Sequence, residues 1–211
     1  MPEQSDQAFW DERYLTHPTA IWSGRPNEYL LREAVDLQPG RALDVACGEG
    51  ADAIWLAERG WQVTAVDLSP VALQRGAALA EQTGPETATR IEWVHADLTT
   101  WDPGSARFDL VTSHYIHLPS LARRAMTERL AGALAPGGSL LVVGHHPSDL
   151  QTSIPRPPEP DLFFTGDDIA ADLGAYEWEI VTNAAPGRTA TDPEGNAVTI
   201  HDTVFRAQRR T

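Results

Sequence analysis

The chain has 211 residues, 42% of them hydrophobic, which is enough for one full core, so we expect a single domain over residues 1–211. Thirty acidic and sixteen basic side chains give a formal net charge of −14, which would repel a nucleic-acid backbone and an anionic membrane alike. One cysteine excludes an internal disulfide, and the first residues lack the positive flank and apolar core of a signal peptide. We therefore expect a cytoplasmic protein, monomer or homodimer, whose partner is a small molecule and neither nucleic acid nor membrane.

The first part of the chain predicts two helices. Aromatic residues recur at helical spacing near the start, and an amphipathic stretch follows over residues 28–37. A loop around Trp22 separates the two. We expect residues 1–38 to form a helical cap on a core that covers residues 39–211.

Strand and helix patterns alternate after the cap. Short apolar runs predict five strands, at residues 42–46, 61–66, 91–95, 108–113 and 139–144. Helical patterns lie between them, at residues 51–59, 70–82 and 121–134. Ser69 suits the N-cap of the second of these helices, and Pro70 suits its first position, where no amide donor is needed. This alternation predicts a parallel sheet with helices on both faces.

The last quarter of the chain departs from this alternation. Residues 147–160 hold five prolines and almost no periodicity, so we expect a loop, and its place after a strand end suggests a lid. A short helix over residues 165–173 leads to two strands, at 176–184 and 198–207, joined by a loop. The predicted fold class is α/β: a Rossmann-like doubly wound sheet, mostly parallel, with an antiparallel C-terminal hairpin and an N-terminal helical cap.

The stretch LDVACGEG, residues 43–50, joins a strand to a helix through a glycine turn. Such a turn brings the polar atoms of a ligand against backbone amides at a helix N-terminus. GEGADA fits the dinucleotide fingerprint GxGxxG/A, and Asp67 after the next strand would accept hydrogen bonds from ribose hydroxyls. Asp44, however, would repel a pyrophosphate and suits a ligand with an ammonium or sulfonium group. S-adenosylmethionine carries both groups.

The stretch ALDVACGEGADAIWLAERGWQVTAVDLSPVAL resembles the first two motifs of the class I methyltransferases. Asp44, Gly48 and Gly50 belong to the first motif, and Asp67 belongs to the second. LAPGGSLLVV resembles the turn of that family into its fifth strand. The resemblance covers roughly residues 40–145, and it implies an enzyme that uses S-adenosyl-L-methionine and releases S-adenosyl-L-homocysteine.

The resemblance also implies roles for single residues. Asp67 would hold the ribose hydroxyls, and the backbone of Gly48 and Gly50 would let the methionine portion approach. HADLTTW places Asp97 where the family keeps an acidic residue near the adenine, so Asp97 and Leu98 would flank that ring. The expected cofactor-binding set is completed by Trp22, Asp44, Ala46, Leu68 and Ser113. Ala46 stands where the family has glycine, and we expect this alanine to tighten the loop. The structural alternative is that Asp44 caps the strand end and that the glycines only turn the chain.

FWDERY followed by WSGRPN resembles the small-molecule branch that includes thiopurine and tellurite-resistance methyltransferases. In that branch an N-terminal segment folds over the cofactor. Trp10, Tyr14 and Trp22 would offer aromatic faces to a sulfonium through cation–π attraction. For Trp10 and Tyr14, packing of the helix on the sheet is an equally open interpretation.

Four of the seven histidines follow two strand ends: His114 and His117 after the fourth strand, His145 and His146 after the fifth. Ligands of a doubly wound sheet bind at that edge. A neutral imidazole there would take a proton from an attacking hydroxyl, amine or thiol. These four residues, with Tyr14, are the catalytic candidates. Zinc or nickel binding is the other interpretation, but no CxxC or HExxH spacing supports it, so we expect no metal site.

The sequence thus predicts methyl transfer to an O, N, S or chalcogen nucleophile of a small molecule by direct displacement. This reaction needs mainly in-line placement of the nucleophile, because the donor already carries a good leaving group. An NAD(P)-dependent oxidoreductase and a non-catalytic S-adenosylmethionine-binding module remain as alternatives.

Overall fold

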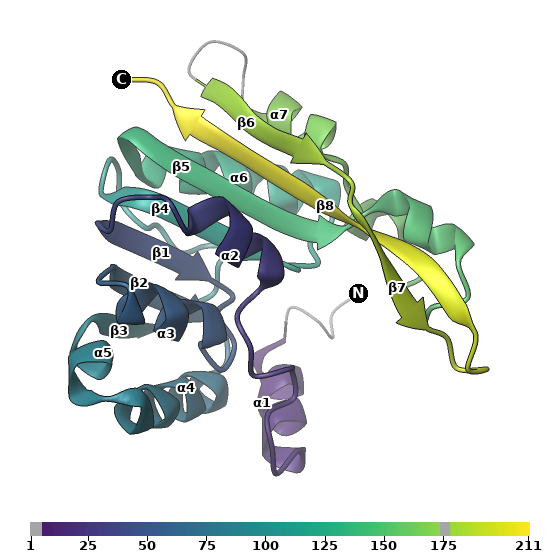
Figure 1. Ribbon diagram of the computed structural model, residues 1–211, viewed down its shortest axis with the longest axis horizontal. Helices are drawn as coiled ribbons and strands as arrows, with labels where there is room; N and C mark the ends of the chain where they lie inside the picture. Colours follow the sequence, from purple (N-terminus) through teal and green to yellow (C-terminus); the bar gives the residue numbers. More distant parts are fainter. Residues whose placement is uncertain (1–5, 174–177) are drawn as a thin grey trace.

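The computed structural model describes residues 6–173 and 178–211. Its sheet has the strand order β3-β2-β1-β4-β5-β8-β6, and β7 pairs with β8 outside this path (Figure 1). The strands are β1 (Arg41–Val45), β2 (Gln62–Asp67), β3 (Ile91–His95), β4 (Phe108–His114), β5 (Leu134–His145), β6 (Trp178–Ala184), β7 (Gly187–Thr191) and β8 (Ala197–Arg209). Each pairing among β1 to β5 is parallel, whereas β8 is antiparallel to β5, β6 and β7.

Helices cover both faces of the sheet, so the doubly wound α/β fold expected from the sequence is confirmed. Successive side chains of a strand point to opposite faces. Leu110 of β4 accordingly belongs to one core cluster with α2 and α3, and Val111 belongs to the other with α6 and α7. Figure 1 shows α2 on the near side of the sheet and α6 and α7 behind it. The helices are α1 (Gln7–Thr16), α2 (Glu28–Ala34), α3 (Ala51–Glu58), α4 (Pro70–Thr83), α5 (Pro85–Thr89), α6 (Ser120–Ala133) and α7 (Gly166–Leu173).

Local capping explains where the helices next to the glycine turn begin. The Ser69 hydroxyl accepts a hydrogen bond from the amide of Ala72 (3.2 Å), and Pro70 takes the first position of α4, as the sequence predicts. Asp6 caps α1 in the same way through the amide of Ala8 (2.9 Å). Gly50 precedes α3 with φ 79°, a conformation that favours glycine.

The structure differs from the sequence prediction in its C-terminal part. The loop expected between the last two strands contains β7, and β8 inserts between β5 and β6. The predicted start of one strand, at residue 176, lies outside the described residues. Residues 147–160 contain the short 3₁₀ helix η2 (Pro147–Gln151), and η3 (Pro160–Leu162) begins at their end. The helix α5 was also not predicted, because its five residues are too few for a periodic pattern.

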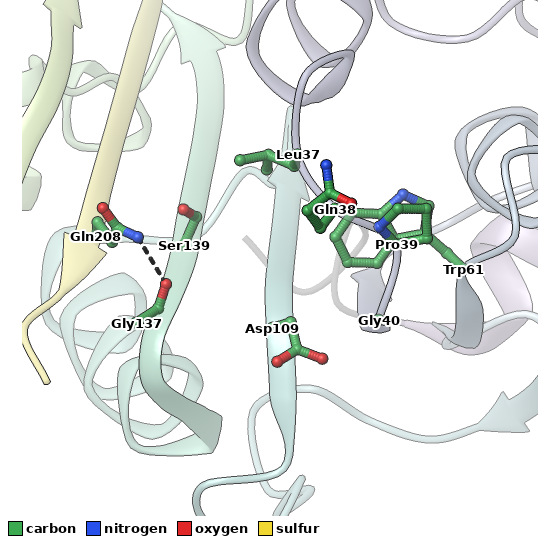
Figure 2. A pocket seen from close by; sticks show the side chains of 9 residues that line it. All are labelled: Leu37, Gln38, Pro39, Gly40, Trp61, Asp109, Gly137, Ser139 and Gln208. Carbon is green, nitrogen blue, oxygen red and sulfur yellow. Dashed lines mark hydrogen bonds between the residues drawn. The ribbon is translucent and has the colours of Figure 1, made fainter.

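The amino ends and the carboxyl ends of the parallel strands lie on opposite sides of the sheet and carry different features. A hollow of about 360 Å³ opens at the amino ends of the strands, between Gly40, Asp109, Ser139 and Gln208 (Figure 2). The carboxyl ends of β1 to β5 lie at the opposite edge, where the predicted site residues are. Among the described residues, no helix is long and apolar enough to cross a membrane.

Candidate active site

Asp44 is a buried carboxylate with one free acceptor atom. It lies beside Thr112 in the parallel register of β1 and β4, and the Thr112 hydroxyl donates to its Oδ1 (2.8 Å). The residue is 2% exposed, and Oδ2 has no hydrogen-bond partner. Burial, together with the nearby charge of Asp52, raises the pKa of this carboxyl to about 7. A cationic group placed against Oδ2 would satisfy the acceptor and favour the ionised form.

The glycine turn after β1 is built from residues with positive φ. Ala46 and Gly48 both have φ 54°, so Ala46 adopts a conformation that favours glycine. The sequence interpretation that Ala46 only tightens the loop therefore missed its backbone conformation. A Cβ on Gly48 would lie 3.1 Å from the Tyr14 hydroxyl, and a Cβ on Gly50 would collide with the Trp93 ring. Both positions must stay small, Gly48 because the cap covers it and Gly50 because Trp93 packs on it.

Asp67 connects the end of β2 to this turn. Its Oδ2 accepts a hydrogen bond from the amide of Gly48 (2.8 Å), and its Oδ1 accepts one from the amide of Ser69 (2.8 Å). Burial raises its pKa, and the two amide hydrogen bonds oppose that rise. Leu68, half-buried, follows it directly. Each carboxylate oxygen keeps a second lone pair, which is the capacity that a ribose diol would use.

Asp97 and Leu98 follow the next parallel strand, β3, at the same edge. Asp97 is exposed, and its Oδ1 accepts hydrogen bonds from the amide (2.8 Å) and hydroxyl (2.7 Å) of Thr99. Leu98 is half-buried against the core cluster that includes α6, and its carbonyl accepts a hydrogen bond from Arg129 (2.7 Å). Ser113 is buried in β4. The structure therefore brings the predicted adenine-side and ribose-side residues to one edge.

The N-terminal segment covers the glycine turn, as the sequence predicts for the cap. Tyr14 is 3% exposed, and its hydroxyl accepts a hydrogen bond from Trp22 Nε1 (3.3 Å). Burial raises the pKa of Tyr14 far above its ordinary value, so the phenol stays protonated. Trp22 is 54% exposed, and its ring centroid lies 6.4 Å from that of Trp10. The Arg13 guanidinium lies 5.7 Å from the Trp22 ring, so a protein cation already contacts this aromatic pair.

Polar contacts that the sequence analysis missed hold the cap in place. Arg75 of α4 donates to Glu49 Oε1 (3.0 Å) and to the carbonyl of His17 (2.7 Å). Glu49, inside the glycine turn, also accepts a hydrogen bond from the amide of Ile21 (3.1 Å). These contacts join residues that are distant in sequence, so no local pattern predicts them.

His114, at the end of β4, forms a carboxylate–imidazole pair. Its Nδ1 lies 2.7 Å from Oδ2 of Asp52, a residue in the first turn of α3. The other oxygen of Asp52 accepts a hydrogen bond from the amide of Asn27 (2.6 Å). His114 Nε2 is buried and has no hydrogen-bond partner. The sequence predicts a role for His114, but no local pattern points to Asp52 as its partner.

His117 and His145 lie in a second, aromatic group at the same edge. Their ring centroids are 5.4 Å apart in a stacked arrangement, and Tyr115 lies 4.8 Å from His145. Burial, with the charges of His145 and Arg156, lowers the pKa of His117 to about 4, so this imidazole is neutral at ordinary pH. Its Nε2 is buried without a hydrogen-bond partner. Phe163, just after η3, extends the group at 6.4 Å from His145.

A buried carboxylate lies behind His145. Asp202 of β8 is the register partner of His145 in the antiparallel β5–β8 pair, and its Oδ1 lies 3.7 Å from His145 Nδ1. It accepts hydrogen bonds from Arg188 Nε (2.6 Å) and the Tyr29 hydroxyl (3.1 Å). Burial alone would raise the pKa of Asp202, but His145 and Arg188 outweigh burial and lower it to about 2. No sequence signal identified Asp202, because strand register sets this pairing.

His146 does not join these groups. Its Nδ1 accepts a hydrogen bond from the amide of Ser148 (3.2 Å), so it caps η2. Arg156, within the loop over residues 147–160, forms an ion pair with the buried Asp149 (2.8 Å). The Asp149 carboxylate in turn accepts a hydrogen bond from the amide of His201 (2.8 Å), which attaches the loop over residues 147–160 to β8.

The chemistry of the described residues at this edge fits an organic cofactor. No group of three or more histidine, cysteine, aspartate and glutamate side chains in the described ranges could hold a metal. Instead, the edge offers a free buried carboxylate oxygen, a carboxylate with spare lone pairs and a small-residue turn. These are the partners that the ammonium, ribose and methionine portions of S-adenosylmethionine require.

Comparison with known proteins agrees with this assignment. Residues 42–138 match the methyltransferase domain family. The chain is 30% identical over 164 residues to 2-heptyl-1-hydroxyquinolin-4(1H)-one methyltransferase of Mycobacteroides abscessus, covering 72% of this chain and 70% of that protein. It is 29% identical to thiopurine S-methyltransferase of Vibrio cholerae over 168 residues, covering 72% and 75%. An uncharacterized methyltransferase of Mycobacterium tuberculosis is 41% identical over 115 residues, covering 54% of this chain and 55% of that one.

The fold comparison gives the same class. TehB from Haemophilus influenzae superposes with a TM-score of 0.68 and 18% identity, covering 97% of this chain and 67% of that one. The fold is the one that S-adenosylmethionine-dependent methyltransferases share. The chain belongs to the methyltransferase family, so the resemblance expected from the sequence is confirmed, and S-adenosylmethionine is the cofactor that this membership implies. The chain spans about half the length of the first curated relatives it matches.

Proposed function

We propose that this protein methylates a small aromatic molecule at an acidic O–H, N–H or S–H group, using S-adenosylmethionine as the donor. One observation carries the proposal. Asp44 Oδ2 and His114 Nε2, at the ends of neighbouring strands, are both buried without hydrogen-bond partners. Buried polar atoms are almost always paired, so a free carboxylate oxygen on one strand and a free imidazole nitrogen on its neighbour support a donor subsite beside an acceptor subsite.

Asp44, Gly48 and Asp67 would hold the cofactor. Asp44 would accept a hydrogen bond from its ammonium group, Asp67 would bind the ribose hydroxyls, and the turn at Gly48 would admit the methionine portion. Asp97 and Leu98 would border the adenine, and the cap around Trp22 would cover the methionine end. When bound, the cofactor supplies a methyl group on a sulfonium, whose carbon–sulfur bond breaks with its electron pair left on sulfur.

On the acceptor side, His114 is our candidate general base. Its Nε2 would take the proton that leaves the acceptor as the new bond to the methyl carbon forms, and Asp52 would balance the imidazolium charge. The stacked rings of His117 and His145, with Tyr115 and Phe163 nearby, offer flat surfaces for an aromatic acceptor. The loop over residues 147–160 would close this side.

The names of two relatives support this acceptor class. One acts on a hydroxylated quinolone and the other on the sulfur of thiopurines, and both acceptors are aromatic heterocycles. Chalcogen oxyanions, the remaining class expected from the sequence, would need no base. Turnover of tellurite or selenite that is unaffected by His114→Gln would therefore contradict the aromatic proposal.

Calorimetric titration with S-adenosylhomocysteine, and in parallel with NADH, tests the donor site. We expect saturable S-adenosylhomocysteine binding that Asp67→Asn weakens at least roughly tenfold, since the ribose hydrogen bonds are lost. Asp109→Asn is the control, because Asp109 accepts a backbone hydrogen bond from Arg41 (2.7 Å) at the opposite edge. Binding of NADH alone would overturn the proposal.

Transfer of a labelled methyl group to a panel of phenols, N-hydroxy heterocycles, aromatic thiols and chalcogen oxyanions tests the acceptor site. We expect turnover of aromatic O–H or S–H acceptors, and we expect His114→Gln to abolish turnover of the neutral ones while cofactor binding persists. Cofactor binding without transfer to any acceptor would instead favour a non-catalytic binding module.

A further inference from the structure

We propose that Asp52 is a positioning residue that holds His114 in the tautomer whose Nε2 carries no proton, and that the N-terminal cap helps to hold Asp52. The inference rests on the proposed function, because only a methyl acceptor with a proton to lose needs such a base. Asp52 lies inside the GEGADA stretch, where the dinucleotide fingerprint assigns its position no role.

The hydrogen bonds of Asp52 determine the tautomer. A carboxylate only accepts hydrogen bonds, so a neutral His114 must donate from Nδ1 to Oδ2 at 2.7 Å. The lone pair of the neutral ring then lies on Nε2, the buried atom without a partner. An imidazole held in this way is ready to accept a proton, as a base requires.

Both oxygens of Asp52 are engaged, which makes the carboxylate hard to replace. Oδ1 accepts the hydrogen bond from the amide of Asn27 at 2.6 Å, while Oδ2 faces His114. An asparagine at position 52 has one oxygen for these two donors. If that oxygen keeps the Asn27 amide, its NH₂ group faces His114 Nδ1, which must then accept, and the ring proton moves to Nε2.

Asp52 and His114 meet where solvent has little access. Asp52 lies in the first turn of α3. The side chains of Asp52 and His114 are only 16% and 8% exposed, so water competes little for their hydrogen bond.

The contact with Asn27 couples the base to the cap. Asn27 is the N-cap of α2, and its amide belongs to the segment that also carries Tyr14 and Trp22. Cap residues therefore fix both the cover over the glycine turn and the carboxylate that orients His114. Docking of the cap would complete the cofactor site and the base together.

The tautomer can be measured without knowing the acceptor. Two-bond ¹H–¹⁵N spectra of protein with ¹⁵N-labelled histidine, saturated with S-adenosylhomocysteine, show which ring nitrogen carries the proton. His114→Gln identifies the signals by their absence. We expect His114 protonated on Nδ1 in the wild-type protein and on Nε2 in Asp52→Asn, with no change in the control Asp109→Asn.

A second experiment compares the turnover of two methyl acceptors that differ in acidity. In Asp52→Asn we expect turnover of a neutral phenol to fall roughly 10²-fold. Turnover of 4-nitrothiophenol, ionised at pH 8, should change little, and S-adenosylhomocysteine affinity should stay within about twofold of the wild type. A merely structural role for Asp52 would reduce both turnovers alike.

Two results would overturn the inference. One is a wild-type His114 already protonated on Nε2, which the spectrum shows even if Asp52→Asn fails to fold. The other is an equal loss of turnover with both acceptors in a folded Asp52→Asn protein. Failure of the proposed function gives a different result. The wild-type protein would then transfer no methyl group to any acceptor, while the spectrum would still show which nitrogen of His114 carries the proton.

Discussion

Asp44 and Thr112 face each other across β1 and β4, and their 2.8 Å hydrogen bond leaves the second oxygen of Asp44 buried and free. A folded protein keeps such a group only at a cost in stability. The cost at Asp44 is measurable through its pKa, which burial raises to about 7 from an ordinary value of 3.8.

Asp44→Asn should stabilise the protein without cofactor at pH 8. Between about pH 4 and 7 the folded state binds a proton on Asp44 that the unfolded chain has lost, so the free energy of unfolding falls as the pH rises through this window. Asparagine does not titrate, so it removes this loss of stability at high pH. We expect the free energy of unfolding of Asp44→Asn to exceed that of the wild type by roughly 1–3 kcal/mol at pH 8, and the difference to vanish near pH 4. Thermal unfolding of both proteins at several pH values measures it. Identical pH dependence in the two would contradict the burial argument.

Cofactor affinity should also depend on the ionisation of Asp44. Unlike the stability of the free protein, the affinity should rise with pH. Ionised Asp44 attracts an ammonium group, so S-adenosylhomocysteine should bind wild-type protein more tightly at pH 8 than at pH 6. Asp44→Asn should bind at least roughly tenfold more weakly at pH 8 and lose most of the pH dependence. Isothermal titration at each pH tests this, and an unchanged affinity in the variant would rule Asp44 out of the donor site.

The variant Trp22→Ala tests whether Trp22 only covers the cofactor or also attracts its positively charged sulfonium. The exposed Trp22 ring has Arg13 near it at 5.7 Å and still leaves much of its surface open. We expect S-adenosylmethionine to lose more affinity than S-adenosylhomocysteine, by roughly threefold or more, because only the former carries a sulfonium. Leu15→Ala, at an exposed position of the same segment, is the control. Equal losses for both ligands would mean that Trp22 only covers the site.

Arg75→Met should loosen the cap without unfolding the core. The substitution removes the hydrogen bonds to Glu49 and to the carbonyl of His17 while keeping most of the apolar side chain. Faster amide hydrogen exchange over residues 17–22 and weaker S-adenosylhomocysteine binding are expected. Arg32→Met removes an exposed ion pair with Glu28 and serves as the control, since such pairs contribute little. Unchanged exchange would show that other contacts hold the cap.

Ala46→Gly should stabilise the protein by about 1 kcal/mol. Ala46 has φ 54°, a left-handed conformation that costs alanine roughly 1–2 kcal/mol and glycine almost nothing. Ala125→Gly, on the exposed side of α6, is the matched control and should destabilise by roughly 0.5–1 kcal/mol. Denaturant unfolding measures both, and a loss of stability in Ala46→Gly would mean that the methyl group makes contacts worth more than the strain.

The parts of the site that the sequence predicted are those encoded within short stretches. The turn from Asp44 to Gly50 and the cap at Ser69 each depend on residues a few positions apart, so their patterns are readable. The pairs His114–Asp52 and His145–Asp202 join residues 62 and 57 positions apart in the printed sequence, and strand order and register create them. Local patterns carry no information on such pairs.

The C-terminal strands show the same limit for the fold. The sequence of β7, GRTAT, holds no large apolar side chain, so it reads as part of a loop. Consecutive strands suggested a simple hairpin at the edge. The centre of β8, which includes Val204 and Phe205, is buried, in keeping with its place between β5 and β6.

The place of β8 also sets an order of events during synthesis. Strands β1 to β5 find their neighbours among themselves, so this part of the sheet can pair as the chain leaves the ribosome. β6 is made earlier than β8, yet within the described sheet β8 is its sole neighbour. The edge of β5 therefore stays open until residues 197–209 emerge, and Asp202 reaches His145 only at that moment. A nascent chain held before this point would carry an assembled glycine turn, while His145 would still lack its register partner Asp202.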